Sequence, residues 1–340
     1  MLRRLRQRLF TGASLLALLA LLVAACGGGG GGSSSSGGGG GSNKQLGVAF
    51  FGFAAANSFA QATWAGVQKA AKEMNASAQF FDGDFSGTTQ VKQMKDALVS
   101  GKYDVWVVQA NSGSAVVPQV QEAISKGISV VIEFTPVGTR YDTAKPQVDG
   151  AISIVDVPTH NGKVLGELGI KACGDRSPCR VAYLQGDPSL PLDNARTKAV
   201  LKELSAVKVV AKPVGGYTQD QGRKVGQDLL VAHPDVDVII GSAQAIEGVQ
   251  IVVGQEGKLG KIQLIGNGGS IQAVKGVKSG KWFATYYTPE KTEGYLAAKY
   301  GIKHERGKKV PVTTDVAERF HVRGTKKAIE RFDLHGQYRD

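Results

Sequence analysis

From Leu46 onward, short apolar stretches alternate with amphipathic segments, and this alternation is the feature that most limits the possible folds. In the amphipathic segment that follows the first stretch, Trp64 and Val67 fall on one face of a helix, as expected for a helix that packs against a core. Nearly continuous apolar strands separated by helices are typical of a parallel sheet that is covered on both faces. The pattern begins again at Ile152, after a stretch over residues 135–150 that contains Pro and Gly. The chain is therefore predicted to form two consecutive doubly wound α/β units.

The expected elements can be written as two series. Strands are predicted at about residues 47–52, 78–81, 105–108, 128–134, 152–155, 181–184, 207–211, 236–240, 262–265 and 282–287. Helices are predicted at about residues 60–74, 88–99, 116–126, 161–171, 195–204, 221–231, 246–255, 271–279 and 290–305. In open α/β sheets, ligands bind beyond the carboxyl ends of the strands, so the turns that follow the strands hold the candidate site residues.

The first 42 residues indicate export. Four arginines precede an uncharged stretch over residues 9–25, which ends in small residues directly before Cys26. A basic region, a short apolar region and small residues at the end are the marks of a secretory signal. A cysteine at that place resembles a bacterial lipobox, in which the thiol is lipidated. We therefore expect a signal peptide over residues 1–25 and an extracytoplasmic protein anchored to the cell membrane through Cys26.

Residues 27–42 are all Gly or Ser. Such a segment buries no apolar surface and behaves as a flexible coil, with a root-mean-square reach of roughly 20–24 Å for its length. Together with Cys26 it is predicted to form a tether that keeps the folded body near a partner in the membrane.

Composition and charge narrow the function further. The formal net charge of +12 falls to about +8 once the four signal arginines are removed, and no basic patch interleaved with aromatic residues accompanies the excess, which argues against nucleic acid as a partner. Cys173 and Cys179 are separated by a segment that contains Gly and Pro, so in an exported protein we expect a structural disulfide. The histidines form no metal-binding spacing, and no nucleophile elbow occurs. We expect no catalytic residue, no metal and no cofactor.

Several motifs follow a family order. Asn57-Ser58-Phe59 lies after the first strand, Leu184-Gln185-Gly186 precedes Arg196, and Leu264-Ile265-Gly266 comes later. In this order the chain, from about residue 46 to 322, resembles the type I periplasmic sugar-binding proteins of the ribose and galactose group. The resemblance implies an α/β fold of two doubly wound parallel-sheet lobes joined by a three-strand hinge. It places residues 43–155 and 288–316 in the N-terminal lobe and residues 156–287 and 317–340 in the C-terminal lobe, with crossings near Asp156, Thr288 and Val316.

The resemblance also implies a ligand held between the lobes. Phe59 and Tyr217 would face each other as an aromatic clamp. Asn57 either caps a helix or binds a ligand hydroxyl, and Arg196 forms either a ligand contact or an ion pair. The further candidates end strands or begin helices at the same edge, and they are Asn111, Phe134, Asn194, Gln244, Asn267 and Tyr287.

Departures from the family pattern leave the ligand open. Glu133-Phe134 stands where sugar binders of this group commonly carry Asp-Arg, and Ser242-Ala243-Gln244 replaces an Asn-Asp pair. The pocket should thus be more neutral and more apolar than a ribose or galactose site. The resemblance implies a monomer that is the binding component of an ABC importer, with a permease as its partner and a sugar or sugar-like ligand. The alternatives are a sensory protein that presents its ligand to a receptor or kinase, and an importer component for a nucleoside or a small aromatic compound.

Overall fold

The computed structural model of the protein describes residues 44–340. The predicted signal peptide, Cys26 and the predicted Gly/Ser tether lie outside the described residues. Within residues 44–340, no helix is both long and apolar enough to cross a bilayer.

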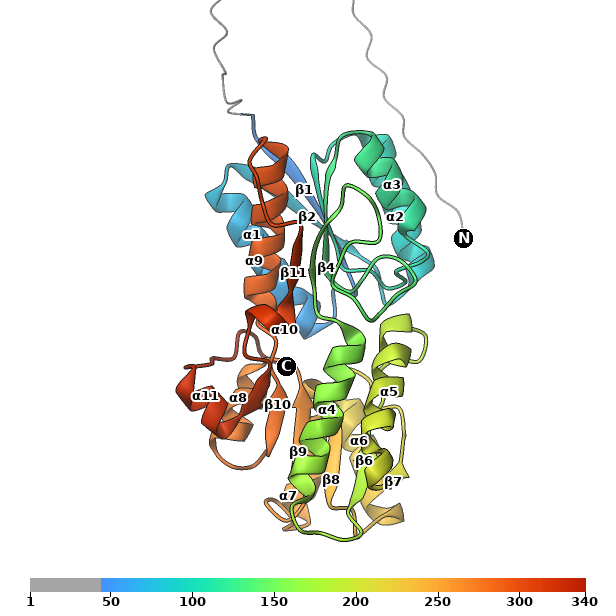
Figure 1. Ribbon diagram of the computed structural model, residues 1–340, viewed down its shortest axis with the longest axis vertical. Coiled ribbons are helices and arrows are strands. Elements are labelled where there is room, and N and C mark those ends of the chain that lie inside the picture. Colours follow the sequence, from blue (N-terminus) through green and yellow to red (C-terminus); the bar gives the residue numbers. More distant parts are fainter. Residues whose placement is uncertain (1–43) are drawn as a thin grey trace, which may run out of the picture. The chain divides into compact units, whose positions relative to one another are not determined.

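The described chain forms two sheets, each covered by helices on both faces (Figure 1). The first sheet has the strand order β11-β5-β4-β3-β1-β2, and its strands are all parallel. These strands are β1 (Leu46–Gly52), β2 (Ala76–Asp82), β3 (Val105–Val108), β4 (Ser129–Phe134), β5 (Ile152–Val155) and β11 (Thr313–Asp315). The helices that accompany this sheet are α1 (Ser58–Glu73), α2 (Gly87–Ser100), α3 (Val117–Ser125) and α9 (Glu290–Glu305). Helices α1 and α9 lie side by side on one face, and α2 and α3 cover the other.

The second sheet repeats this arrangement with the order β12-β10-β9-β8-β6-β7, in which only the pairing of β12 with β10 is antiparallel among the described strands. Its strands are β6 (Arg180–Tyr183), β7 (Lys208–Ala211), β8 (Val238–Ser242), β9 (Gln263–Asn267), β10 (Ala284–Tyr286) and β12 (Arg323–Thr325). The longer helices are α4 (Pro158–Cys173), α5 (Pro191–Glu203), α6 (Gln219–Ala232), α7 (Ala243–Gln255) and α8 (Ile271–Lys278). The short elements are η1 (Leu204–Ala206), α10 (Val316–Arg319) and α11 (Lys326–Arg331).

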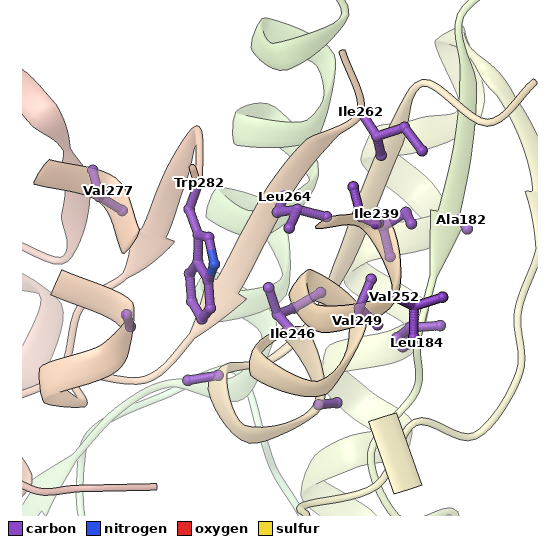
Figure 2. Close-up of a cluster of buried hydrophobic side chains, with 14 of the residues drawn as sticks. Ala182, Leu184, Ile239, Ile246, Val249, Val252, Ile262, Leu264, Val277 and Trp282 are labelled. Carbon is purple, nitrogen blue, oxygen red and sulfur yellow. The ribbon is translucent and has the colours of Figure 1, made fainter. Parts of the chain in front are cut away.

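Each sheet has an apolar core on both of its faces. In the second sheet, Ile239 and Leu264 lie against Val249 of α7, and Trp282 lies between this group and Val277 of α8 (Figure 2). The Trp282 indole N–H, which would be costly to bury unpaired, donates a hydrogen bond to Gln250 Oε1 at 2.8 Å. Because both faces of these strands are buried, their sequences read as apolar runs without alternation.

The closest helix packing depends on glycine. Gly66 of α1 and Gly294 of α9 face the backbone of the opposite helix, and a Cβ at Gly66 would lie 2.0 Å from the carbonyl oxygen of Lys291. A Cβ at Gly294 would lie 2.1 Å from the carbonyl oxygen of Thr63. The close contact between the two helix backbones fixes α9 against α1. It thereby holds the beginning of α9 at the junction of the two lobes.

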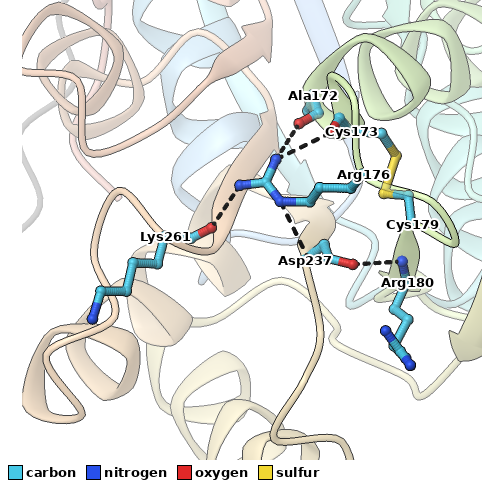
Figure 3. The surroundings of a disulfide bond; sticks show 7 residues. All are labelled: Ala172, Cys173, Arg176, Cys179, Arg180, Asp237 and Lys261. Carbon is cyan, nitrogen blue, oxygen red and sulfur yellow. Dashed lines mark hydrogen bonds and ion pairs between the residues drawn. A yellow bond between two sulfur atoms is a disulfide. The ribbon is translucent and has the colours of Figure 1, made fainter.

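The structure joins Cys173 to Cys179 by a disulfide, with 5.7 Å between their Cα atoms (Figure 3). Arg176 lies inside the loop that the disulfide closes, and its guanidinium donates to the carbonyl oxygens of Cys173 and Lys261. Asp237 accepts from the backbone N–H of Arg180 at 2.8 Å. The loop is thus tied to the start of β6 and to the segment before β9, far from the strand ends that face the other lobe.

The predicted fold class is confirmed, because the chain forms two parallel-sheet α/β lobes. The chain passes between the sheets after β5, after β10 and after β11. Three predicted helix starts need correction. Helix α4 begins at Pro158 and not near residue 161, α5 begins at Pro191 and not near residue 195, and α7 begins at Ala243 and not near residue 246. For α7 the reason is local: the Ser242 hydroxyl accepts a hydrogen bond from the N–H of Ala245 and caps the helix directly after β8. Gln244 therefore lies in the first turn of α7 and does not end a strand.

Candidate functional site

A cavity of about 40 Å³ lies between the lobes, beyond the carboxyl ends of the strands. Both lobes contribute to its wall. The lining residues are Phe53, Asn57, Phe59, Phe85, Phe134, Leu190, Leu192, Arg196, Tyr217, Gln244, Asn267, Gly268 and Thr288. This is the place where open α/β sheets bind ligands. Seven of the ten ligand-binding residues expected from the sequence are in that wall.

Aromatic rings fill most of the space around the cavity. In the first lobe, the ring of Phe134 meets that of Phe59 edge to face, with centroids 4.6 Å apart, and it meets Phe53 at 6.2 Å. Across the lobes, Phe85 stacks on Tyr217 with centroids 5.9 Å apart and an angle of 13° between the planes. The sequence predicts Phe59 and Tyr217 as opposing rings. Both line the cavity, but the ring that lies directly against Tyr217 is Phe85.

Among the lining residues within 44–340, Arg196 is the one cation, and its charge is neutralised. Its Nη1 lies 2.6 Å from Asp193 Oδ1, and the two side chains are 6% and 3% exposed. Tyr217 donates its hydroxyl proton to the same carboxylate, at 2.6 Å. Burial alone lowers the pKa of Arg196, but the carboxylate of Asp193, with smaller contributions from tyrosine oxygens, outweighs burial and raises that pKa. Of the two interpretations that the sequence left open for Arg196, the structure shows the ion pair.

Three amides complete the lining, and each uses one of its polar atoms inside the protein. Asn57 Oδ1 accepts from the N–H of Ala60 at 3.0 Å and so caps α1. Gln244 Nε2 donates to the Ser58 hydroxyl in the other lobe at 3.2 Å. Asn267 Oδ1 accepts from Asn161 at 3.1 Å. The second polar atom of each amide makes no hydrogen bond within residues 44–340.

Three expected residues do not line the cavity. Asn111 is 2% exposed, and its amide donates to the carbonyl oxygen of Phe53 at 3.1 Å, so it holds the loop after β1 from behind. Asn194 is exposed on α5 and donates to the carbonyl oxygen of Pro188. Tyr287 is buried, and its hydroxyl donates to the carbonyl oxygen of His335. In each case the side chain donates its hydrogen bond to a backbone carbonyl oxygen.

Sequence reasoning also missed several site residues: Phe53, Phe85, Leu190, Leu192, Asp193, Gly268 and Thr288. A usable signal existed for Asp193, which precedes Arg196 by three residues in a helix, so the two side chains share a face. No comparable signal marks Phe85, which follows Asp84 in a turn that contains no helical or strand periodicity.

Buried carboxyl groups lie behind the cavity wall. Glu133, next to Phe134, accepts a hydrogen bond from Gln109 at 3.0 Å, while burial and the nearby Glu290 raise its pKa to about 8. Burial likewise raises the pKa of Glu290 to about 8. Both oxygens of Glu293 lack a hydrogen-bond partner among the described residues, and its pKa is raised by burial and then by the charge of Glu133. No group of three ligating side chains within residues 44–340 is arranged to hold a metal ion.

Comparisons with known proteins point to one family. Residues 48–309 match the sequence profile described as a periplasmic binding protein domain. The D-ribose/D-allose-binding protein of Pseudomonas aeruginosa is 28% identical over 209 residues, which are 58% of this chain and 61% of that protein. The ribose import binding protein of Bacillus subtilis is 24% identical over 252 residues, which are 73% of this chain and 78% of that protein.

Solved structures share the fold at low sequence identity. An ABC transporter solute binding protein from Mycobacterium smegmatis, with bound glycerol, is 21% identical with a TM-score of 0.71, covering 87% of this chain and 100% of that one. The Caulobacter myo-inositol binding protein is 18% identical with a TM-score of 0.68, covering 79% of this chain and 90% of that one.

Proposed function

The chain belongs to the periplasmic binding protein domain family, and from this premise we propose that it is the solute-binding component of an ABC importer, which holds a sugar or sugar-like small molecule between its lobes. The observation that carries the proposal is a cavity lined by both lobes at the carboxyl ends of two parallel sheets. A ligand that contacts both walls favours the arrangement in which the lobes meet, and a permease can distinguish that arrangement from an open one.

We infer the ligand class from the relatives and from the polar residues of the wall. The relatives from Pseudomonas and Bacillus are named for ribose or allose, and solved structures of the same fold hold glycerol and myo-inositol. Amides from both lobes, Asn57 and Gln244, with Asn267 beside them, offer the donors and acceptors that a hydroxylated ring uses. We propose a binding role and no catalysis, a monomeric state, and lobe boundaries near Asp156, Thr288 and Val316.

A binding screen tests this function. The purified protein is heated with and without each of D-ribose, D-allose, myo-inositol and a set of other small solutes, and the unfolding midpoint is recorded. A ligand present at 100 times its Kd stabilises the folded state by about 2.7 kcal/mol, which moves the midpoint measurably. If no small solute raises the midpoint, the solute-binding proposal is contradicted. Co-purification with a permease supports an importer, whereas co-purification with a receptor or kinase supports the sensory alternative.

We propose further that Cys26 carries a lipid that anchors the protein outside the cytoplasm, on the basis of the sequence before it. Cys26→Ala should move the protein from the membrane pellet to the supernatant after cell fractionation. Ser34→Ala, in the predicted tether, is the matched control and should leave the protein in the pellet. Retention of Cys26→Ala in the pellet after washing would contradict the anchor.

A further inference from the structure

Residues 334–340 follow the helix α11 and return to the junction of the two lobes (Figure 1). They form no helix or strand, yet Tyr338 is only 7% exposed. Their backbone is bound to the second lobe. The N–H of Gln337 donates to the carbonyl oxygen of Gly269 at 3.1 Å, and the carbonyl oxygen of Tyr338 accepts from the N–H of Ile271 at 2.7 Å. This segment is therefore held as an extension of the second lobe, next to the start of α8.

One side chain of the segment caps a helix of the first lobe. Helix α9 begins after Pro289, which supplies no side-chain cap. The amide of Gln337 takes that role, because its Oε1 accepts from the N–H of Thr292 at 3.0 Å and its Nε2 donates to the Thr292 hydroxyl at 2.9 Å. The first N–H groups of a helix have no partner within the helix. Gln337 therefore satisfies a donor of the first lobe, although its own backbone is bound to the second.

The ring of Tyr338 supports the cavity wall where the two lobes meet. It meets Phe59 of the first lobe edge to face, with ring centroids 6.3 Å apart and an angle of 77° between the planes. Its hydroxyl lies beside Gly268 of the second lobe, where an added Cβ would come within 2.8 Å of that oxygen. Phe59 and Gly268 line the cavity, whereas Tyr338 does not. The Tyr338 ring therefore limits the positions that Phe59 can take in the wall.

Asp340 adds another contact across the lobes. Its N–H donates to Gln272 Oε1 of α8 at 3.3 Å, and its Oδ1 accepts from the hydroxyl of Ser58, the first residue of α1, at 3.4 Å. The Ser58 hydroxyl in turn accepts from Gln244 Nε2 at 3.2 Å, and Gln244 lines the cavity. The segment thus makes polar and aromatic contacts with the first lobe through its side chains, while its backbone stays on the second.

We propose that Gln337, Tyr338 and Asp340 form a clasp that favours the arrangement in which the lobes meet and that positions Phe59 in the ligand site. All three are positioning residues, because none of them lines the cavity. Where it concerns affinity, the inference rests on the proposed binding function.

The clasp should act through the population of the arrangement that binds. A protein whose binding-competent arrangement is only partly populated binds its ligand more weakly, in proportion to that fraction. Contacts that form when the lobes meet therefore strengthen the binding of any ligand that touches both walls. One hydrogen bond of this kind changes the ratio of the two arrangements about 2- to 12-fold.

The distance between spin labels on the two lobes tests the clasp without a ligand. The labels are attached at Lys95→Cys in α2 and Lys224→Cys in α6, two exposed positions, in a chain that also carries Cys26→Ala. Pulsed electron paramagnetic resonance then gives the distribution of the distance between the labels. Gln337→Ala and Tyr338→Ala should each shift this distribution toward longer distances, and the double variant should shift it further. An unchanged distribution in the double variant would overturn the clasp, whatever the protein binds.

Calorimetric titration with D-ribose, D-allose and myo-inositol measures the effect on affinity. Tyr338→Ala should weaken the binding of the solute that the wild type holds by at least about fivefold, because Phe59 loses its support and the lobes lose a contact. Tyr338→Phe restores the ring and should regain the wild-type affinity. If none of the three solutes binds the wild type, that failure belongs to the proposed function, and the label distances decide the clasp.

Leu334→Ala is the matched control for a merely structural role. Leu334 lies in the same segment, but it packs in the apolar core of the second lobe. Its truncation should lower the unfolding midpoint and leave both the affinity and the label distances unchanged. Equal losses of affinity in Leu334→Ala and Tyr338→Ala would show that the segment only stabilises the fold, and they would overturn the inference.

Discussion

Removing the carboxylate of Asp193 should destabilise the protein strongly, because it leaves the charge of Arg196 buried without a counter-ion. The two side chains are 3% and 6% exposed, and their charged atoms lie 2.6 Å apart. At an effective dielectric constant of about 20, two unit charges at this distance attract each other by about 6 kcal/mol, and desolvation offsets much of that gain. Breaking such a pair from one side costs about 3–5 kcal/mol. The hydroxyl of Tyr217 also loses its acceptor.

Urea unfolding measures this cost. For an m-value of about 3 kcal/mol/M, Asp193→Ala should lower the midpoint by about 1–1.7 M. Asp142→Ala is the matched control, because the ion pair of Asp142 with Arg140 is exposed at 58% and 65%, and it should change the free energy of unfolding by less than about 1 kcal/mol. Adding Arg196→Met to Asp193→Ala should recover most of the loss, because the uncompensated charge is gone. Equal effects of the two single aspartate variants would refute the reasoning.

Three further predictions concern stability. Burial raises the pKa of Glu133 from 4.5 to about 8, so the folded protein retains a proton that the unfolded chain releases. The free energy of unfolding should therefore fall as pH rises from about 4.5 to 8. In urea titrations at several pH values, Glu133→Gln should flatten this dependence, and an unchanged dependence would contradict the prediction. Gly66→Ala should cost at least about 2 kcal/mol, because its Cβ would lie 2.0 Å from the Lys291 carbonyl oxygen, whereas Gly254→Ala serves as a helical control, because its Cβ would meet only the side chain of Leu259, at 3.2 Å. Cys173→Ser should lower the free energy of unfolding by about 2 kcal/mol from loop-closure entropy, and wild type treated with reductant should show the same loss if the disulfide is the cause.

The long elements could be predicted from the sequence because each has its own periodicity. The strands Val105–Val108 and Ile152–Val155 and the helix Glu290–Glu305 have the predicted bounds. By contrast, β11, β12, α10 and α11 are too short to show a period, and they form because the crossings place them beside an existing sheet edge or helix. Their existence depends on tertiary contacts that no local window contains.

Site residues could be predicted from the sequence where their position at a strand end or helix start places them in the wall. They could not be predicted where an unusual backbone conformation places them there. Asn57, Gln244 and Asn267 lie at strand ends or helix starts, and parallel strands bring those positions together. Asn111 has the same kind of position, yet its side chain donates a hydrogen bond to the carbonyl oxygen of Phe53 in a neighbouring loop. The sequence does not show in which direction a side chain points after a strand, so this could not be predicted. Phe85 enters the site through a left-handed turn that contains no glycine at that residue, so turn chemistry gives no sign of it.

The ring contact across the lobes bears on how tightly any ligand can bind. In the structure Phe85 already stacks on Tyr217, so a ligand ring that enters between them replaces one ring contact with two. An aromatic pair contributes about 0.5–1.5 kcal/mol beyond its buried area, so the net gain from stacking is about one such contact. Most of the affinity must then come from desolvating the ligand ring and from pairing the buried Arg196 Nε, which has no partner among the described residues. The rings therefore limit the shape of a ligand that fits, and the polar atoms of the wall that lack a partner distinguish among the ligands that fit.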